Sequence, residues 1–299
     1  MTSYNPRLLL PPEEEEVYPY RRVWRSLALE SILLLLVTVG LWVVLTFIGL
    51  RVPAIVQRPV GVLLALLPLG LWAALSLLQE RGVPEPRAHL VAVVAIAALA
   101  TNAIALPLID NFFQVERWLP LTNAINRIAG YTFTVGVVQV MTGYLVVRFV
   151  AYRDGMRVRV DGIAYMLAAS VGYATVLNLH YVISTDAAID IVAMRVFNNT
   201  ALLYAISVVV GYGLGEVRFG RPTPLLLTLT LALGAMLAGI AIPVRSGLVN
   251  AALSLAPASA SPIRGIGLSA LLLVGVAIAT SFLIENAERQ DREAEAARE

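Results

Sequence analysis

The sequence predicts an all-α, polytopic bundle of about eight transmembrane helices. The chain is 59% hydrophobic and 14% charged. It also contains eight long runs without an interior charge, and a helix of about 20 residues spans the roughly 30 Å of a bilayer's hydrocarbon core. The runs are continuously apolar and do not alternate, which favours helices over barrel strands. In chain order they are Ser31–Leu50, Val60–Leu78, Leu90–Ile109, Ile128–Val147, Gly162–Thr185, Val196–Gly215, Pro222–Val244 and Gly265–Ile284.

The third and eighth runs are the least distinctive, because they are rich in Ala and Gly. Two connections are longer than plain turns. Asn111–Arg127 carries three large aromatic residues beside charged ones, which predicts an interfacial helix at headgroup level. Gly247–Arg264 is rich in Ala, Ser and Pro and is predicted to be a partly helical loop.

The flanks divide the chain into three parts. Residues 1–26 are rich in Pro and Glu at their start and predict a disordered cytoplasmic tail without the apolar core of a signal peptide. Residues 27–286 form the predicted transmembrane domain. Residues 287–299 combine Glu, Ala and Arg, which is typical of a frayed, exposed helix and predicts a charged cytoplasmic tail.

Arginine distribution predicts the orientation. An even number of spans places both termini on one side of the membrane. Fifteen Arg residues outside the runs lie on that side and seven on the other. Since cytoplasmic loops carry the excess of basic residues, we predict a multi-pass protein of the cytoplasmic (inner) membrane with both termini in the cytoplasm.

Composition also excludes several chemistries. The chain has no Cys and no Lys, so disulfides, thiolate catalysis and lysine-based catalysis are absent. The Arg residues are dispersed among loops and form no basic stripe, so we expect no nucleic-acid partner. The lipid bilayer is the expected environment.

Polar side chains inside spans are costly in hydrocarbon and therefore mark sites of function or packing. Spans four to six hold most of them and are predicted to share a polar seam. The seam either binds a partner or joins the helices by hydrogen bonds. Its predicted members are Gln139, Thr142, Asn178, Asn199, Thr200, Tyr204 and Ser207. His180 has no carboxylate within a turn in its span, and we interpret it as an interfacial hydrogen-bonding residue because a metal site needs three or more ligands.

Small residues predict where helices pack closely. Gly211 and Gly215 form a GxxxG pair, and Gly172 belongs to a small-xxx-small pair. Asp161 opens span five directly before Gly162. A carboxylate in a first turn is favoured by the helix dipole, so we assign Asp161 a structural role that holds the preceding loop against the helix.

Several of these residues form short motifs whose order along the chain matches that of a known family. Residues 133–217 resemble the core of the PrsW-type intramembrane metalloproteases, relatives of the CAAX prenyl endopeptidases. The resemblance implies about eight spans with the core in spans four to six. The matching motifs are Asp161-Gly162-x-x-Tyr165, Gly172-Tyr173-Ala174, Asn178 with Tyr181, and Gly211-Tyr212-x-x-Gly215.

The chain departs from this family where its chemistry resides. A Glu-Glu pair and a Lys of the family correspond to Val138, Gln139 and Thr142, and a Glu before the Asn of span five corresponds to Leu177. The family's His has no counterpart in residues 199–203. Amides and aliphatic side chains neither ligate a metal well nor activate water. We therefore expect no metal, no cofactor and no catalytic residue.

The leading functional hypothesis is a catalytically degenerate PrsW-like protein, a pseudoprotease that holds a partner's transmembrane helix in the polar seam. A first alternative is a diverged intramembrane metallopeptidase of the same family. A second is a transporter or a subunit of a larger membrane complex. We rank the transporter lower because no span shows a buried carboxylate or Arg suited to ion or proton coupling.

Overall fold

The computed structural model describes residues 20–49, 52–80, 86–220, 225–250 and 262–296. Within these ranges there is no strand, and eight helices are long and apolar enough to cross a membrane, which confirms the predicted fold class. The eight spans are α2 (Tyr20–Thr46); α3 (Ala54–Trp72) with η2 (Ala73–Leu77) and α4 (Leu78–Glu80); α5 (Leu90–Ala100) with η3 (Thr101–Ala105) and η4 (Leu108–Phe112); α7 (Ala124–Tyr131) with η6 (Thr132–Gly136) and α8 (Val137–Val150); α9 (Asp161–Ser184); α10 (Ile189–Phe219); α11 (Leu226–Asn250); and α12 (Pro262–Ala296).

The helices at both ends of the chain extend beyond the uncharged runs. Helix α2 begins at Tyr20, so residues 20–26 of the predicted tail are helical, while residues 1–19 lie outside the described ranges. Helix α12 continues to Ala296. Charged residues at a helix end can reach the headgroups or water without ending the helix.

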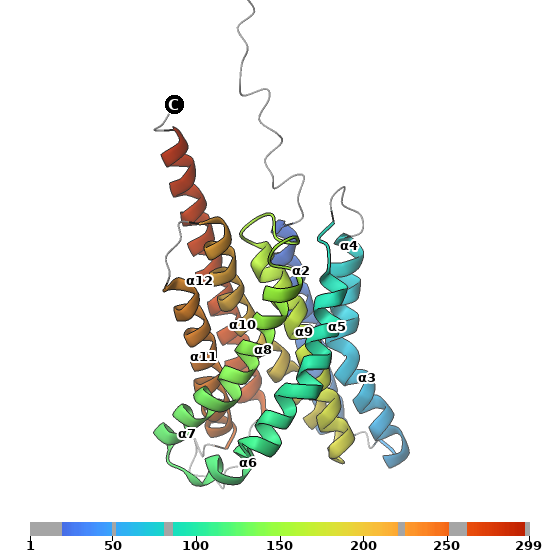
Figure 1. Ribbon diagram of the computed structural model, residues 1–299. Helices are drawn as coiled ribbons and strands as arrows, with labels where there is room; N and C mark the ends of the chain where they lie inside the picture. Colours follow the sequence, from blue (N-terminus) through green and yellow to red (C-terminus); the bar gives the residue numbers. More distant parts are fainter. Residues whose placement is uncertain (1–19, 50–51, 81–85, 221–224, 251–261, 297–299) are drawn as a thin grey trace, which may run out of the picture.

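Helices α9 and α10 form the centre of the bundle. Their most apolar windows are 78% and 83% buried, whereas those of the first and last spans are 22% buried. Helices α3 and α5 pack on α9, and helices α2, α11 and α12 pack on α10 (Figure 1). Most polar side chains in the middle of α9 and α10 are therefore buried among other protein groups.

Glycines bring the backbones of α9 and α10 into contact. A Cβ atom on Gly162 would meet the carbonyl oxygen of Gly211, and one on Gly215 would meet that of Arg159. On another face of α9, a Cβ atom on Gly172 would meet the carbonyl oxygen of Val94 in α5. Small residues are needed at such crossings because any side chain would push the backbones apart.

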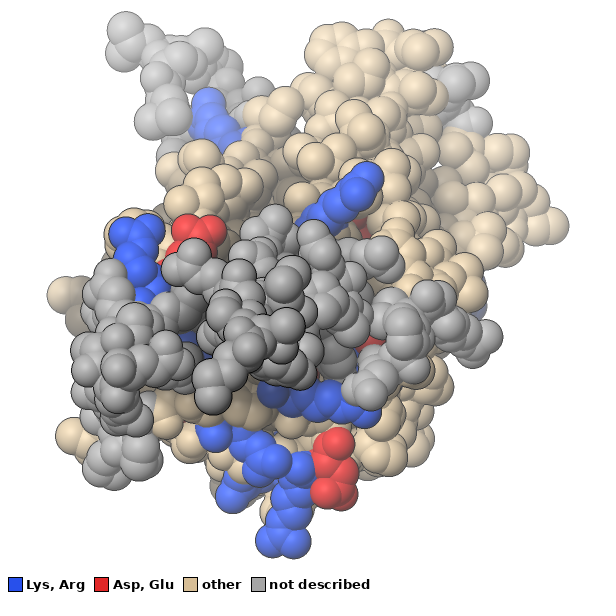
Figure 2. Space-filling model, turned by 90° about the horizontal axis from the view of Figure 1, so that it is seen from above, with Lys and Arg blue, Asp and Glu red and all other residues tan. Residues whose placement is uncertain are grey.

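The two ends of the bundle differ. Helix α2 begins and α12 ends at the same end, which we call the terminal end (Figure 1). Arg side chains are visible on this end (Figure 2), where Arg153 and Arg157 of the α8–α9 loop are exposed.

The opposite, far end carries a helical hairpin in place of the single interfacial helix predicted for residues 111–127. It consists of α6 (Val115–Trp118), η5 (Leu119–Leu121) and the start of α7. The chain breaks at Gln114, whose φ is 48°, and again before Asn123, whose side chain accepts the N–H of Asn126. A left-handed residue and a new N-cap each interrupt a helix.

Candidate functional site: a polar pocket at the far end

A cavity of about 360 Å³ lies at the far end of the bundle, between spans three to seven. Charged and aromatic side chains line part of its wall, and leucines with two amides line the rest. The cavity therefore offers both polar recognition and an apolar surface. Its lining includes Asp110, Glu116, Gln139, Leu177, His180, Tyr181, Arg195, Asn199, Leu202, Leu203 and Arg245.

Three amides of the predicted seam come together here. Gln139 and Asn199 line the cavity, and Nδ2 of Asn199 donates a hydrogen bond of 3.1 Å to Oδ1 of Asn178. Oε1 of Gln139 and Nδ2 of Asn178 are buried without a hydrogen-bond partner. The buried hydroxyl of Tyr173 lies beside Gln139 in the same wall. Unsatisfied buried polar groups are costly, so this wall has spare hydrogen-bonding capacity for an occupant.

The remaining seam residues do not belong to this wall. Thr142 donates to the carbonyl oxygen of Val138 in its own helix, and the buried Thr200 hydroxyl has no partner. Ser207 is buried within α10. Tyr204 donates instead to Glu30 of α2. The structure thus divides the predicted seam between the pocket and a separate polar contact.

His180 has a carboxylate partner from another span. Its Nε2 atom lies 3.6 Å from Oδ2 of Asp110 in η4, and both side chains are about half exposed, at 51% and 43%. The sequence showed only that span five lacks a carboxylate near His180. The partner could not be found by spacing, since it depends on how the third and fifth helices pack.

Two arginines face the same cavity from different helices. Arg195 comes from α10 and Arg245 from α11. The guanidinium of Arg195 stacks over the ring of Tyr181 from α9, 4.0 Å from its centroid. Such stacking fixes the orientation of the guanidinium. Sequence reasoning counted both arginines as loop charges and missed their convergence.

Glu30 overturns one premise of the sequence analysis. It lies within the first span, is only 3% exposed, and accepts hydrogen bonds of 2.8 Å from both Ser76 and Tyr204. The first span therefore contains a buried carboxylate, and the prediction that no span has one was wrong. Glu30 was overlooked because it stands one position before the first uncharged run.

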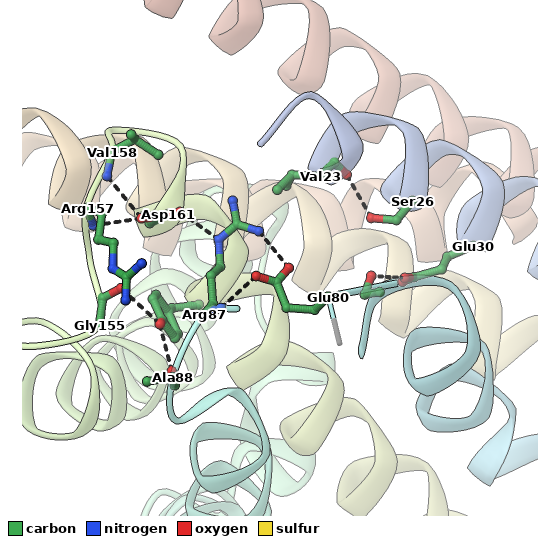
Figure 3. A network of polar contacts seen from close by, with 12 residues as sticks. Val23, Ser26, Glu30, Glu80, Arg87, Ala88, Gly155, Arg157, Val158 and Asp161 are labelled. Atoms are coloured by element: carbon green, nitrogen blue, oxygen red, sulfur yellow. Dashed lines mark hydrogen bonds and ion pairs between the residues drawn. The ribbon is translucent and has the colours of Figure 1, made fainter. Parts of the chain in front are cut away.

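A buried ionic network closes the terminal end (Figure 3). Arg87 donates from Nε to Oδ1 of Asp161 at 2.6 Å and from Nη1 to Oε2 of Glu80 at 2.9 Å. The other oxygen of Asp161 accepts the backbone N–H groups of Arg157 and Val158 at 2.7 and 3.0 Å. Asp161 therefore binds the loop before α9 and not the first turn of the helix itself.

Tyr165 completes this corner. Its hydroxyl lies 2.7 Å from the carbonyl oxygen of Ala88 and 3.0 Å from that of Gly155. The Asp-Gly-x-x-Tyr motif thus joins the loop before α9 to the segment that leads into α5. A small cavity of about 40 Å³ separates this network from Glu30. These contacts support the fold at the end remote from the pocket.

The eight apolar helices, the buried central pair and the far-end pocket together define a multi-pass membrane protein with an internal site. The chain belongs to the PrsW family of intramembrane metalloproteases, because the model of the PrsW family intramembrane metalloprotease matches residues 85–280. The match extends well beyond the predicted core of residues 133–217. No curated protein and no solved structure matches the chain.

The residues present do not fit the metal that this family implies. Within the described ranges there is no group of three or more His, Cys, Asp or Glu side chains that could hold a metal ion. Asp110 and His180 form a pair, whereas a zinc site takes three or four protein ligands. The described side chains therefore provide too few ligands for a zinc ion.

Proposed function

We propose that this protein binds a segment of a partner membrane protein in the far-end pocket and does not hydrolyse it. In this proposal the protein is a pseudoprotease of the cytoplasmic membrane, with both termini in the cytoplasm. The observation that carries it is the chemistry of the pocket. Gln139 and Leu177 line it at positions where the family resemblance places carboxylates.

Binding without cleavage follows from these side chains. An amide donates and accepts hydrogen bonds, but it cannot act as a general base. It is also a poor metal ligand, so it does not hold the metal ion that would lower the pKa of a bound water. Leu177, Leu202 and Leu203 add an apolar surface. A polypeptide supplies both apolar side chains and backbone groups, which suits such a mixed wall.

The amides confer selectivity more than strength. Oε1 of Gln139 and Nδ2 of Asn178 are free to accept and donate. A hydrogen bond between transmembrane helices is worth about 0.6–2 kcal/mol. Two or three such bonds distinguish partners, and the apolar contacts supply most of the remaining affinity.

Site-specific photo-crosslinking in native membranes tests the binding. A photoreactive residue at Leu203 should give a polypeptide adduct, whereas one at Ile278, on the exposed face of α12, serves as the lipid-facing control. Gln139→Leu with Asn199→Leu should reduce the adduct several-fold. Thr142→Val, which removes a hydroxyl bonded within its own helix, should leave it unchanged. An unchanged adduct in the Gln139/Asn199 variant would overturn the proposal.

Elemental analysis separates this function from a diverged metallopeptidase. Asp110, His180 and Glu116 all line the pocket and are the groups from which such an enzyme would draw ligands. We expect substoichiometric zinc in protein purified without chelators. Stoichiometric zinc that is lost in His180→Ala would instead establish the peptidase.

A further inference from the structure

Resting on the proposed function, we infer that the pocket recognises its partner through a carboxylate held between Arg195 and Arg245. The partner would be a membrane polypeptide with an Asp or Glu, or its chain terminus, at the far-end membrane edge. The amides of the pocket do not by themselves distinguish one chemical class of occupant from another.

The arginine pair is only partly compensated, because Glu116 and Asp110 attract Arg195 from exposed positions. Both residues line the same cavity from the neighbouring helices α10 and α11, so their like charges oppose one another there. None of the ion pairs within the described ranges includes either residue. Nε of Arg195 is also buried without a hydrogen-bond acceptor. An anion between the two groups would relieve the repulsion and supply the acceptor.

The carboxylates that line the pocket do not fill this role. Asp110 is 43% exposed and lies beside His180. Glu116 is exposed at the start of the hairpin. Attractions of exposed charges are weakened by water and salt. Tyr181 holds the Arg195 guanidinium in place from one face, and a fixed guanidinium matches the planar fork of a carboxylate through paired N–H···O bonds.

Buried polar atoms favour a polypeptide over a lipid. A phospholipid would also bring an anion, but its acyl chains would then meet the wall formed by Gln139 and Asn199. Hydrocarbon offers no hydrogen bond to the buried, unpaired Oε1 of Gln139. A polypeptide backbone can satisfy that oxygen while an acidic side chain reaches the arginines.

The test uses the crosslinkable Leu203 chain in its native membrane. Arg195→Gln with Arg245→Gln keeps hydrogen-bonding capacity and removes both charges. We expect this pair of changes to lower the yield of the polypeptide adduct about tenfold, the effect of about 1.4 kcal/mol. Arg117→Gln is the matched control, because Arg117 is an exposed far-end arginine bonded to Gln114 and does not line the pocket. Mass spectrometry of the adduct should identify an acidic residue or chain terminus near the crosslink.

Each result has one meaning. Loss of adduct in the arginine variant, with full yield in the Arg117 variant, supports the carboxylate. An adduct that depends on Gln139 and Asn199 but not on the arginines overturns this inference and leaves the proposed function intact. Absence of any polypeptide adduct overturns both. A phospholipid adduct that depends on the arginines replaces the polypeptide with a lipid headgroup.

Discussion

Asp161 illustrates how a single residue acquires its role from contacts that lie far apart in sequence. It is fully buried and pairs with Arg87, while its second oxygen accepts two backbone N–H groups of the preceding loop. A buried charge is stable only when it is paired and hydrogen-bonded. Asp161 thus fixes the start of α9 relative to the start of α5.

Replacing Asp161 should therefore cost more than the loss of a helix cap. An N-cap is worth about 0.5–2 kcal/mol, whereas removal of one partner of a buried ion pair costs about 3–5 kcal/mol. We expect Asp161→Ala to lower the free energy of unfolding by the larger amount, measured as helix loss in a detergent titration. Asp154→Ala, an exposed carboxylate in the same loop, should have almost no effect. Equal stability of the two variants would contradict the assignment.

At the scale of elements, the crossing of α9 and α10 depends on glycine. A Cβ atom on Gly211 would lie 2.7 Å from the carbonyl oxygen of Gly162, well inside van der Waals contact. Backbone atoms cannot rotate away as side chains can. The two helices must therefore separate to accept even one methyl group. The same two helices contribute residues to the wall of the pocket.

We expect Gly211→Ala to destabilise the protein by about 1–3 kcal/mol, the usual cost of overpacking. Gly275→Ala in α12 is the control, because nothing lies within 4 Å of its added Cβ atom. The control should be neutral or stabilising by about 0.5–1 kcal/mol, since Ala is the better helix former. The same detergent titration distinguishes the two. A stable Gly211 variant would show that the crossing can relax.

For the whole molecule, the distribution of charge predicts the membrane orientation. The terminal end carries the exposed Arg153 and Arg157, and the positive-inside rule assigns such an end to the cytoplasm. The chain has no Cys, so single cysteines report orientation cleanly. Asp154→Cys should react with a membrane-impermeant maleimide only after permeabilisation, and Asp186→Cys of the α9–α10 loop should react in intact spheroplasts. The reverse pattern would invert the topology.

The sequence alone determined the helical membrane class and the eight spans, because exclusion of charge from hydrocarbon acts on each segment separately. It also indicated the family, through the motifs around Asp161 and Gly211. Only the tertiary structure decided which polar residues meet. Gln139, Asn178 and Asn199 converge while Tyr204 turns to Glu30, and Asp110 reaches His180 from another span. Such contacts depend on the rotation and crossing of whole helices, which the periodicity of one segment does not specify.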